Sequence, residues 1–512
     1  MKLFAAIDVG SYETGMKIFE LSRKSGVKEL DYVRRRVDLG TDSYNTGKIS
    51  YERMDELCSV LNGFREIMAS YKVESYRAYG TSAIRETENT KVVLDQIKLR
   101  TGLTVSSLSN SEQRFLDYKS VALRSLTFDD IIGSGTAFID IGGGSTQVSL
   151  FDSSKLITTV NLRIGILRLR SSLNELEPGS INYERLLNEL IEDEVHTFKK
   201  MFLKKLVIRN IIVVDDHLPY IIHKLSGNSA DDSFDSSVTA AQFVEFIDKL
   251  KQMSNEQISK EVGIPMESSP LLLSSSYIIK QLIKAMEAEK IYVPGVSLSD
   301  GIAYDYAEKN KIIKSSHDFG QDIISSVENI SQRYRGSQGS GTILSKSALA
   351  IFDGMKKYHG IDQRGRLLLE IAARLRDVGK FISLAAPAES AYSIIMGTEI
   401  IGLSHLEREM VALMVERSYT GDMTYEDVMV YGLDEKSYLT VIKLTAILRL
   451  ASGMLRSHKR KYEFVKAVEK EKELIITVDT NDDIALERGL FHRRAGLFEE
   501  VFGIRPVLKK KM

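Results

Sequence analysis

Residues 138–146 read FIDIGGGST, an apolar run that ends in an aspartate followed, one residue later, by three consecutive glycines. Ala137 to Ile141 predicts a buried strand, and Gln147 to Phe151 predicts the strand that returns after the turn. Residues 5–11 read AAIDVGS, so the same device of strand, Asp-x-Gly turn and strand occurs twice, about 130 residues apart. Such a duplication predicts two related α/β domains that face one another across a cleft.

The glycines of these two turns also bear on chemistry. A turn of the Asp-x-Gly-Ser type presents backbone N–H groups from a bend that glycine adopts without steric cost. Such donors can hold phosphoryl oxygens, and the aspartate beside them can hold Mg²⁺ or order a water molecule. Three glycines in a row weaken a backbone, and a ligand that approaches it closely would explain them. For one turn alone an ordinary β-turn is the alternative, whereas the pair predicts a phosphate-binding cleft.

The composition is that of a folded protein with several domains. The chain has 512 residues, of which 43% are hydrophobic and 27% charged, and its length predicts roughly three or four domains. Lys and Arg total 69 against 70 for Asp and Glu, so the net charge of -1 does not favour duplex nucleic acid as a partner. With one cysteine, Cys58, and no apolar stretch of about 18 residues, we expect a cytoplasmic protein without a membrane span.

Periodicity along the chain predicts its domain organisation. Strand and helix signals alternate through the first three hundred or so residues, with one of the expected helices at about 239–260. Helical periodicity then dominates from about 315 to 457, and Glu473 to Val478 predicts a strand near the end. The expected division is two α/β domains, an all-α domain and a small helical or α+β module, at residues 1–125, 126–312, 313–430 and 431–512.

Four motifs, in their order and spacing, resemble a known family. They read AAIDVGS at 5–11, YGTSAIRE at 79–86, LSNSEQ at 108–113 and FIDIGGGST at 138–146. Together with VSLSDGIAYDYA at 296–307, they resemble the exopolyphosphatase and guanosine pentaphosphate phosphatase family, which belongs to the acetate/sugar kinase, Hsp70 and actin superfamily. The resemblance implies two ribonuclease H-like (actin-like) domains around a cleft, a helical HD-like domain after them, and a homodimer.

The resemblance also implies an activity and the residues that carry it. The family hydrolyses terminal phosphates from inorganic polyphosphate or pppGpp using Mg²⁺, for which Mn²⁺ is the alternative. By resemblance, Asp8 and Asp140 organise the metal and the water, while Arg85 neutralises phosphate charge with its forked guanidinium. A surface ion pair of Arg85 with Glu86 or Glu88 is the alternative for that residue. The residues implied in phosphate contact are Gly10, Ser11, Gly142, Gly143, Gly144 and Ser145.

The chain departs from the family at positions that bear on catalysis. The family's helix after its Ser-Gly turn, which corresponds to the LSNSEQ motif here, usually starts with two glutamates, the second being the proposed base. In this chain the pair is Glu112-Gln113. A glutamine amide does not take a proton from water at neutral pH. Glu112 could replace it only by repositioning, because neighbouring helix residues point about 100° apart. The family's acid after the triple-glycine turn is Gln147, and Asp215-Asp216 replaces a third glycine turn.

The helical region departs from its family pattern too. HD enzymes bind metal through a histidine, an adjacent His-Asp pair and a later aspartate. Here Arg376-Asp377 stands at the position of the pair, and Ser452 stands where the later aspartate is expected. We therefore expect this region to be structural and not catalytic.

From these features we expect a phosphohydrolase that removes terminal phosphate from polyphosphate or pppGpp with a divalent metal. The alternative is a binding or sensor protein of the same family that holds a polyphosphate or nucleotide without turning it over. Gln113 and Gln147 favour this alternative, whereas Asp8, Asp140 and the intact glycine turns are common to both.

Overall fold

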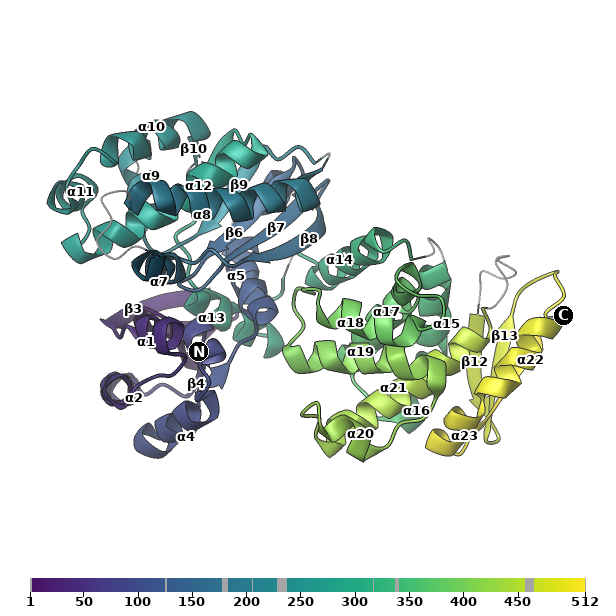
Figure 1. The fold of residues 1–512 in the computed structure, drawn as a ribbon. Coiled ribbons are helices and arrows are strands. Elements are labelled where there is room, and N and C mark those ends of the chain that lie inside the picture. Colours follow the sequence, from purple (N-terminus) through teal and green to yellow (C-terminus); the bar gives the residue numbers. More distant parts are fainter. Residues whose placement is uncertain are drawn as a thin grey trace. The chain divides into compact units, whose positions relative to one another are not determined.

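The computed structural model describes residues 2–124, 127–176, 183–204, 206–227, 237–315, 317–336, 340–455 and 465–511. The chain divides into two compact units, Met1–Phe319 and Gly320–Met512, which are described one after the other (Figure 1). The boundary expected between residues 125 and 126 lies outside the described residues. None of the described helices is long and apolar enough to cross a membrane.

The first sheet has five strands in the order β3-β2-β1-β4-β5. The strands β1, β2 and β3 pair antiparallel, and β4 and β5 continue the sheet parallel to β1. Most side chains of β1 are buried, as expected for a central strand covered on both faces. The strands are β1 (Lys2–Val9), β2 (Glu13–Ser22), β3 (Gly26–Arg36), β4 (Ser75–Gly80) and β5 (Ser106–Ser107).

The second sheet repeats this arrangement, with six strands in the order β10-β11-β9-β6-β7-β8. Its first three strands again pair antiparallel, and β9 and β11 follow parallel to β6. The strands are β6 (Thr136–Ile141), β7 (Thr146–Asp152), β8 (Lys155–Leu162), β9 (Asn210–Val214), β10 (Ser237–Thr239) and β11 (Lys290–Tyr292). The predicted duplication of an α/β domain is therefore confirmed. Below, each sheet with its helices is called the first or the second lobe.

Helices pack on both sheets of the first unit (Figure 1). The helices of the first lobe that precede the second sheet are α1 (Leu39–Thr46), α2 (Tyr51–Tyr71), α3 (Ser82–Glu86), α4 (Thr90–Thr101) and α5 (Asn110–Arg124). After α5 the chain continues with α6 (Phe128–Ile132), α7 (Ile166–Leu176), α8 (Tyr183–Phe198), α9 (Leu218–Ser226), α10 (Ala240–Leu250), α11 (Asn255–Val262) and α12 (Ser269–Met286). The single helix expected at 239–260 is thus two helices, because Ser254 caps the start of the second one.

The helix α13 (Leu298–Lys309) packs on the first sheet although it follows the second sheet in the sequence. Its residues Leu298 and Ile302 share one apolar cluster with Phe4 of β1. The Lys17 ammonium of β2 lies 2.9 Å from the Asp300 carboxylate, a buried ion pair that fixes the same contact. The last helix of the segment expected as the second domain, residues 126–312, therefore packs on the first lobe.

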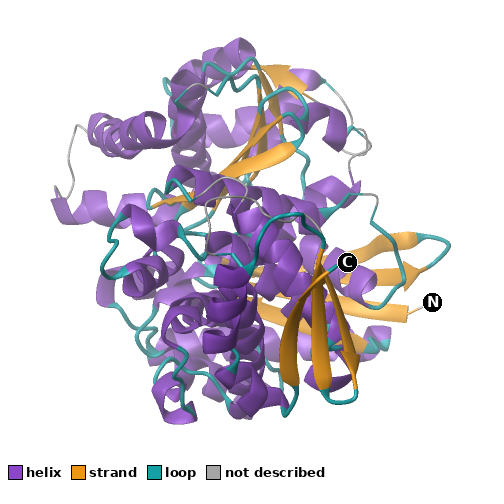
Figure 2. Cartoon of the chain, turned by 90° about the vertical axis from the view of Figure 1, so that its right-hand side faces the viewer, coloured by secondary structure: helices purple, strands orange, loops and turns teal. Residues whose placement is uncertain are grey.

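The second unit is a helical body followed by a small sheet. The body consists of α14 (Phe319–Arg333), α15 (Ser340–Gly354), α16 (Lys356–His359), α17 (Gln363–Leu375), α18 (Pro387–Met396), α19 (His405–Thr420), α20 (Tyr425–Met429) and α21 (Glu435–Gly453). Three strands, β12 (Val465–Lys470), β13 (Glu473–Val478) and β14 (Arg505–Lys510), then lie side by side (Figure 2). The helices α22 (Ala485–Arg494) and α23 (Gly496–Phe502) connect β13 to β14. The boundary expected at 430 precedes α21, which packs on α15 and α19 as well as on α22.

Candidate active site

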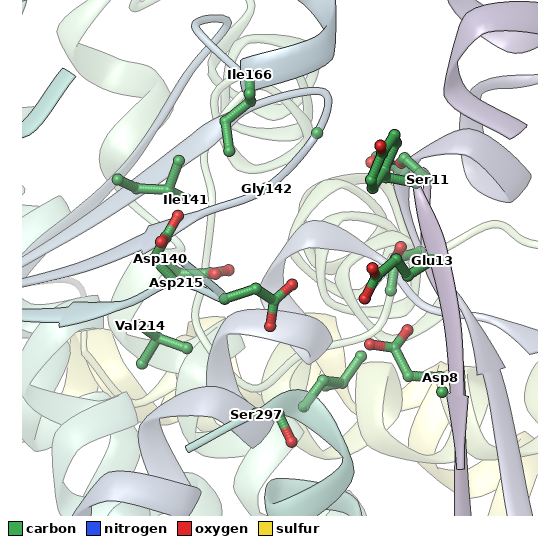
Figure 3. A pocket seen from close by; sticks show the side chains of 18 of the residues that line it. Asp8, Ser11, Glu13, Asp140, Ile141, Gly142, Ile166, Val214, Asp215 and Ser297 are labelled. Atoms are coloured by element: carbon green, nitrogen blue, oxygen red, sulfur yellow. Dashed lines mark hydrogen bonds between the residues drawn. The ribbon is translucent and has the colours of Figure 1, made fainter. Parts of the chain in front are cut away.

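A cavity of about 140 Å³ lies between the two lobes of the first unit, where the glycine turns meet. In Figure 3, Asp8, Ser11 and Glu13 approach it from the first lobe, and Asp140 and Asp215 approach it from the second. Seven of the predicted site residues line this cavity: Asp8, Gly10, Ser11, Gln113, Asp140, Gly142 and Gly143. The four that do not line it are Arg85, Glu112, Gly144 and Ser145.

The turn between β1 and β2 is tight because Gly10 allows it. The amide of Gly10 donates to the carbonyl of Glu13 at 3.0 Å, which closes the hairpin. A Cβ atom at Gly10 would lie 2.6 Å from that same carbonyl oxygen, too close for any other residue without a shift of the backbone. The turn therefore holds Asp8 and Ser11 at its two ends in fixed positions on the cavity wall.

The hydroxyl of Ser11 belongs to a triangle of hydroxyl groups. Ser11 Oγ lies 2.9 Å from Tyr44 Oη and 2.9 Å from Ser82 Oγ, and the latter two atoms are 2.8 Å apart. The three side chains come from the first turn, from α1 and from the start of α3. Three mutually bonded hydroxyls restrict one another's orientation, so Ser11 presents a positioned polar group to the cavity.

The triple-glycine turn packs directly against the first turn. A Cβ atom at Gly143 would lie 2.8 Å from Ser11 Cβ, and one at Gly144 would lie 2.7 Å from Tyr44 Oη. The prediction that the two turns share one cleft is therefore confirmed. Within the described residues, the backbone amides of Ser11 and Gly143 donate to no protein acceptor, so they are available to a ligand in the cavity.

The cavity gathers buried carboxyl groups whose pKa values are raised. Burial, and then the negative charges of Asp216 and Asp140, raise the pKa of Asp8 to about 8. Burial raises the pKa of Asp140 to about 7, although the positive charge of Arg114 lowers it. Burial and the charges of Asp140 and Asp8 raise the pKa of Asp117 well above its usual range. Burial, together with repulsion between neighbouring acids, therefore favours the protonated form of these carboxyl groups.

Of the two neighbouring residues predicted to be catalytic, Glu112 and Gln113, only one lines the cavity. Gln113 lines the cavity, and its Nε2 donates to Asp140 Oδ2 at 3.4 Å. Glu112 instead forms the N-terminal cap of α5, where its Oε2 accepts from Ser109 Oγ at 2.8 Å and from the Ser109 amide at 3.0 Å. The capping bonds hold the carboxylate of Glu112 away from the cavity wall, so of the two residues only Gln113 lines the cavity.

Arg85, which was predicted to neutralise phosphate charge, does not line the cavity. Arg85 Nη1 donates to the carbonyl of Leu108 at 2.8 Å, and the side chain is not part of the cavity wall. Arg168 of α7 approaches the triple-glycine turn instead, since its Nε donates to the Gly144 carbonyl at 2.7 Å. Its Nη2 also pairs with Glu86 of the first lobe. No sequence motif indicated Arg168, because its position depends on how α7 packs.

The glutamine at 147 has a buried partner. Arg114 Nε donates to Gln147 Oε1 at 2.8 Å, and the arginine is completely buried. Gln147 and Arg114 lie on β7 and α5, so this bond ties the helix that carries Gln113 to the second sheet. Gln147 is not part of the cavity wall.

In the acidic pair Asp215-Asp216, which replaces a third glycine turn, Asp215 has a structural role. Asp215 Oδ1 accepts from the amides of His217 and Leu218 at 2.7 Å each, and Ser275 Oγ donates to its Oδ2 at 2.7 Å. These bonds satisfy the free amides at the start of α9. Asp216 and His217 line the cavity.

The donors around the cavity suit a hard divalent cation. The part of the chain that the structure describes contains no group of three or more His, Cys, Asp or Glu residues arranged to hold a metal. Mg²⁺ does not require such a cage, because it is commonly held by one or two carboxylates together with waters and substrate phosphates. Asp8 Oδ1 is buried without a hydrogen-bond partner, which leaves a carboxylate oxygen for such an ion. The expected residues Asp8 and Asp140 therefore fit Mg²⁺ or Mn²⁺ in chemical type.

In the second unit the positions of the HD motif carry a different arrangement. The Arg376 guanidinium lies 3.9 Å from the centre of the Tyr419 ring, and its Nη1 donates to Asp377 Oδ1 at 3.1 Å. Ser452 Oγ donates to the carbonyl of Arg449 at 2.7 Å. The guanidinium of Arg376 is a hydrogen-bond donor only and does not ligate a metal, so this position lacks the imidazole of the HD pattern.

Comparisons with known proteins follow the same division of the chain. The model of the Ppx/GppA phosphatase family matches residues 21–310, and that of Ppx/GppA phosphatase domain III matches residues 324–493. The guanosine-5'-triphosphate,3'-diphosphate pyrophosphatase of Photobacterium profundum is 22% identical over 496 residues, which cover 93% of this chain and 91% of that protein. Exopolyphosphatase 1 of Mycobacterium tuberculosis is 20% identical over 302 residues, 58% of this chain and 86% of that protein.

Solved structures share the fold. The Aquifex aeolicus member of the Ppx/GppA family superposes with a TM-score of 0.50 at 21% identity, covering 62% of this chain and 99% of that chain. An exopolyphosphatase from Cytophaga hutchinsonii superposes with a TM-score of 0.53 at 18% identity, covering 61% of this chain and 100% of that chain. With family models that cover most of the sequence and a shared fold, the chain belongs to the Ppx/GppA phosphatase family.

Proposed function

We propose that this protein is a phosphohydrolase that releases terminal phosphate from inorganic polyphosphate or from pppGpp. The observation that carries the proposal is the contact of the two glycine turns at one cavity, with the amides of Ser11 and Gly143 available there. Backbone amides of this kind bind phosphoryl oxygens irrespective of what the rest of the substrate is. The names of relatives support both substrates, so the proposal covers both.

The proposed roles follow from position on the cavity wall. Gly10, Gly142 and Gly143 let the backbone approach the phosphate closely, and the Ser11 hydroxyl, held by Tyr44 and Ser82, donates a hydrogen bond to it. Gly144 and Ser145 lie outside the wall and shape the turn, since a Cβ at Gly144 would collide with Tyr44. Arg168, which bonds to this turn, is a better candidate than Arg85 for the nearby positive charge.

We propose Mg²⁺ or Mn²⁺ as the cofactor, held by cavity carboxylates that include Asp8 and Asp140. When bound, the ion would neutralise charge on the phosphoryl group. Asp8, with its pKa of about 8, otherwise keeps a proton at neutral pH and offers no charge to a phosphate.

The test is phosphate release by the full chain from polyphosphate and from pppGpp, each with Mg²⁺, with Mn²⁺ and with a chelator. Turnover of either substrate that depends on the cation is the expected result. Asp140→Asn should reduce this turnover, because asparagine has nearly the same volume as aspartate but supplies no carboxylate to the cavity. No phosphate release from either substrate under any of these conditions would contradict the proposal.

A protein that binds without turnover is the second candidate, and Gln113 supports it. At this position the amide donates to Asp140 and offers no carboxylate to accept a proton from water. Direct binding of polyphosphate and pppGpp, measured by calorimetry on the same samples, separates the two. Tight binding without phosphate release would favour the sensor.

We further propose that the protein is cytoplasmic and works as a homodimer. Its single cysteine, Cys58, is free and buried, which fits a reducing compartment. Light scattering on the purified chain measures its mass in solution, and a monomer at micromolar concentration would contradict the dimer.

A further inference from the structure

Asp117 is a cavity residue that lies outside the motifs shared with the family. It stands on α5 one helical turn after Gln113, and side chains four residues apart share a face of a helix. Asp117 is 2% exposed, and neither of its buried carboxyl oxygens accepts a hydrogen bond from a donor group in the described part of the chain. The group that it contacts is another acid, Asp140. A buried carboxylate without a donor or a cation beside it is costly, so the side chain must keep a proton or take a cation.

A second oxygen on the same helix face is also without a partner. Gln113 Oε1 is buried and accepts no hydrogen bond within the described residues. The amide is oriented by its other end, since Nε2 donates to Asp140 Oδ2 at 3.4 Å. Asp140 in turn interacts directly with Asp117. Oxygens of three side chains, from α5 and from the end of β6, are therefore gathered at one part of the cavity wall.

The charge around these oxygens is unbalanced. Asp117 feels the negative charges of Asp140 and Asp8, and burial prevents water from screening them. Arg114, the buried arginine of α5, directs its Nε to the oxygen of Gln147 at 2.8 Å. A cation between the carboxylates of Asp117 and Asp140 would relieve this repulsion and use the oxygens that lack partners.

We propose that Asp117, Asp140 and the amide oxygen of Gln113 form a divalent-cation site for Mg²⁺ or Mn²⁺. Carboxylate and amide oxygens are the donors such ions prefer, and two carboxylates leave positions for waters and phosphate oxygens. Asp117 thereby supplies from the next helical turn the acid that is missing at 113. The inference rests on the proposed function for the role of the ion, but binding of the ion can be measured without any turnover.

The experiment measures Mn²⁺ binding to the full-length chain, without substrate, from the electron paramagnetic resonance signal of free Mn²⁺. Asp117→Asn and Asp140→Asn preserve the shape of each side chain and remove its charge. Glu112→Gln is the matched control, since Glu112 lies on the same helix but its carboxylate caps the helix outside the cavity. We expect each aspartate variant to weaken Mn²⁺ binding at least tenfold and the control to change it less than threefold.

A second measurement keeps the inference testable if one variant folds poorly. Mn²⁺ should raise the melting temperature of the wild type, and Asp117→Ser should abolish that rise as Asp117→Asn does. Without the ion, Asp117→Asn should melt at or above the wild-type temperature, because burial and the neighbouring acids already disfavour the charge that the substitution removes. A purely structural Asp117 would lower the melting temperature on substitution and leave the rise caused by Mn²⁺ intact.

The outcomes separate this inference from the proposed function. Wild-type affinity for Mn²⁺ in Asp117→Asn, with weakened binding in Asp140→Asn, would overturn the role of Asp117 even if the enzyme hydrolyses polyphosphate. Mn²⁺ binding that depends on Asp117 in a chain that releases no phosphate would support the site and contradict the hydrolase. A wild type that binds no Mn²⁺ would overturn the inference directly.

Discussion

Gln113 stands at the position where we propose that a carboxylate would act as the general base. It lines the cavity, contacts Asp140 and lies one turn from Asp117 on the same helix. Gln113→Glu should therefore raise the rate of phosphate release, because a glutamate can accept a proton from the attacking water. A positioned general base contributes about 10²–10⁴-fold, so even the lower figure is easily measured as kcat with polyphosphate.

Glu112 provides the matched comparison for that substitution. Its carboxylate accepts two hydrogen bonds from Ser109 and lies outside the cavity, so Glu112→Gln should leave kcat within a factor of a few. Loss of activity in Glu112→Gln, together with no change in Gln113→Glu, would show that the base has been assigned to the wrong residue.

At the residue scale, the sequence predicts what depends on the local backbone. Gly10 and Gly143 reach the cavity because the pattern of strand, Asp-x-Gly turn and strand determines their geometry within a few residues. Arg85 and Glu112 do not line the cavity, because their side chains are engaged in hydrogen bonds to Leu108 and to Ser109 that the sequence does not reveal. Asp117 could have been predicted from the sequence, because it stands four residues after Gln113 and so lies on the same face of that helix.

At the scale of elements, the crossing of α13 over α5 depends on the absence of a side chain. A Cβ atom at Gly301 would lie 2.1 Å from the carbonyl oxygen of Leu116, which is helix backbone and cannot rotate away. Gly301→Ala should destabilise the first unit by about 1–3 kcal/mol or more, as overpacking does elsewhere. The measurement is urea unfolding followed by circular dichroism.

Gly63 of α2 is the control for Gly301. No atom lies within 4 Å of a Cβ built there, so Gly63→Ala relieves the entropic cost of a helical glycine without a clash. It should stabilise the protein by up to about 1 kcal/mol. Equal effects of the two substitutions would contradict the role of close helix packing at Gly301.

The contact between α17 and α19 in the second unit is an ion pair that responds to pH. Arg364 donates to both carboxylate oxygens of Glu407, at 2.6 and 2.7 Å. Burial alone would raise the pKa of Glu407, but the hydrogen bonds and charge of Arg364 outweigh it and lower that pKa. A lowered pKa in the folded state stabilises the protein above the unfolded pKa of about 4.3 and loses that effect as pH falls.

Glu407→Gln should therefore reduce the free energy of unfolding at pH 7 by about 1–3 kcal/mol. The difference from wild type should shrink as the pH is lowered below about 4, where the wild-type carboxylate takes up a proton. Urea unfolding at several pH values measures it, with Glu471→Gln in the exposed β12–β13 turn as control. A difference that stays constant with pH would show that Glu407 acts by packing and not by charge.

Elements were easiest to predict where they are apolar. β1 and β6 are almost continuous buried runs, whereas β3 has a mostly polar and exposed sequence and gave no strand signal. β3 forms because it is an edge strand paired with β2 over its whole length, a contact that hydrophobic pattern does not reveal. The placement of α13 on the first sheet is likewise a long-range contact that periodicity cannot show.

For the whole molecule, two compact units with their own buried residues predict two unfolding transitions. Gly301→Ala lies in the first unit and Glu407→Gln in the second. In differential scanning calorimetry of the full chain, each substitution should lower one transition and leave the other within about a degree, since separate cores unfold separately. A single transition that both substitutions shift equally would contradict this division.

The fit of Gly143 against Ser11 sets how far the two lobes can close. Because a Cβ atom at Gly143 would lie 2.8 Å from Ser11 Cβ, a single added methyl group would act as a wedge and favour a more open first unit. Amide hydrogen exchange should then be faster in Gly143→Ala over residues 8–15 and 140–147, as mass spectrometry can measure. Gly142→Ala should exchange as wild type does, because its Cβ would meet only Ser145 O at 3.4 Å. The absence of a Cβ atom at Gly143 therefore lets the two lobes come closer than an alanine there would allow.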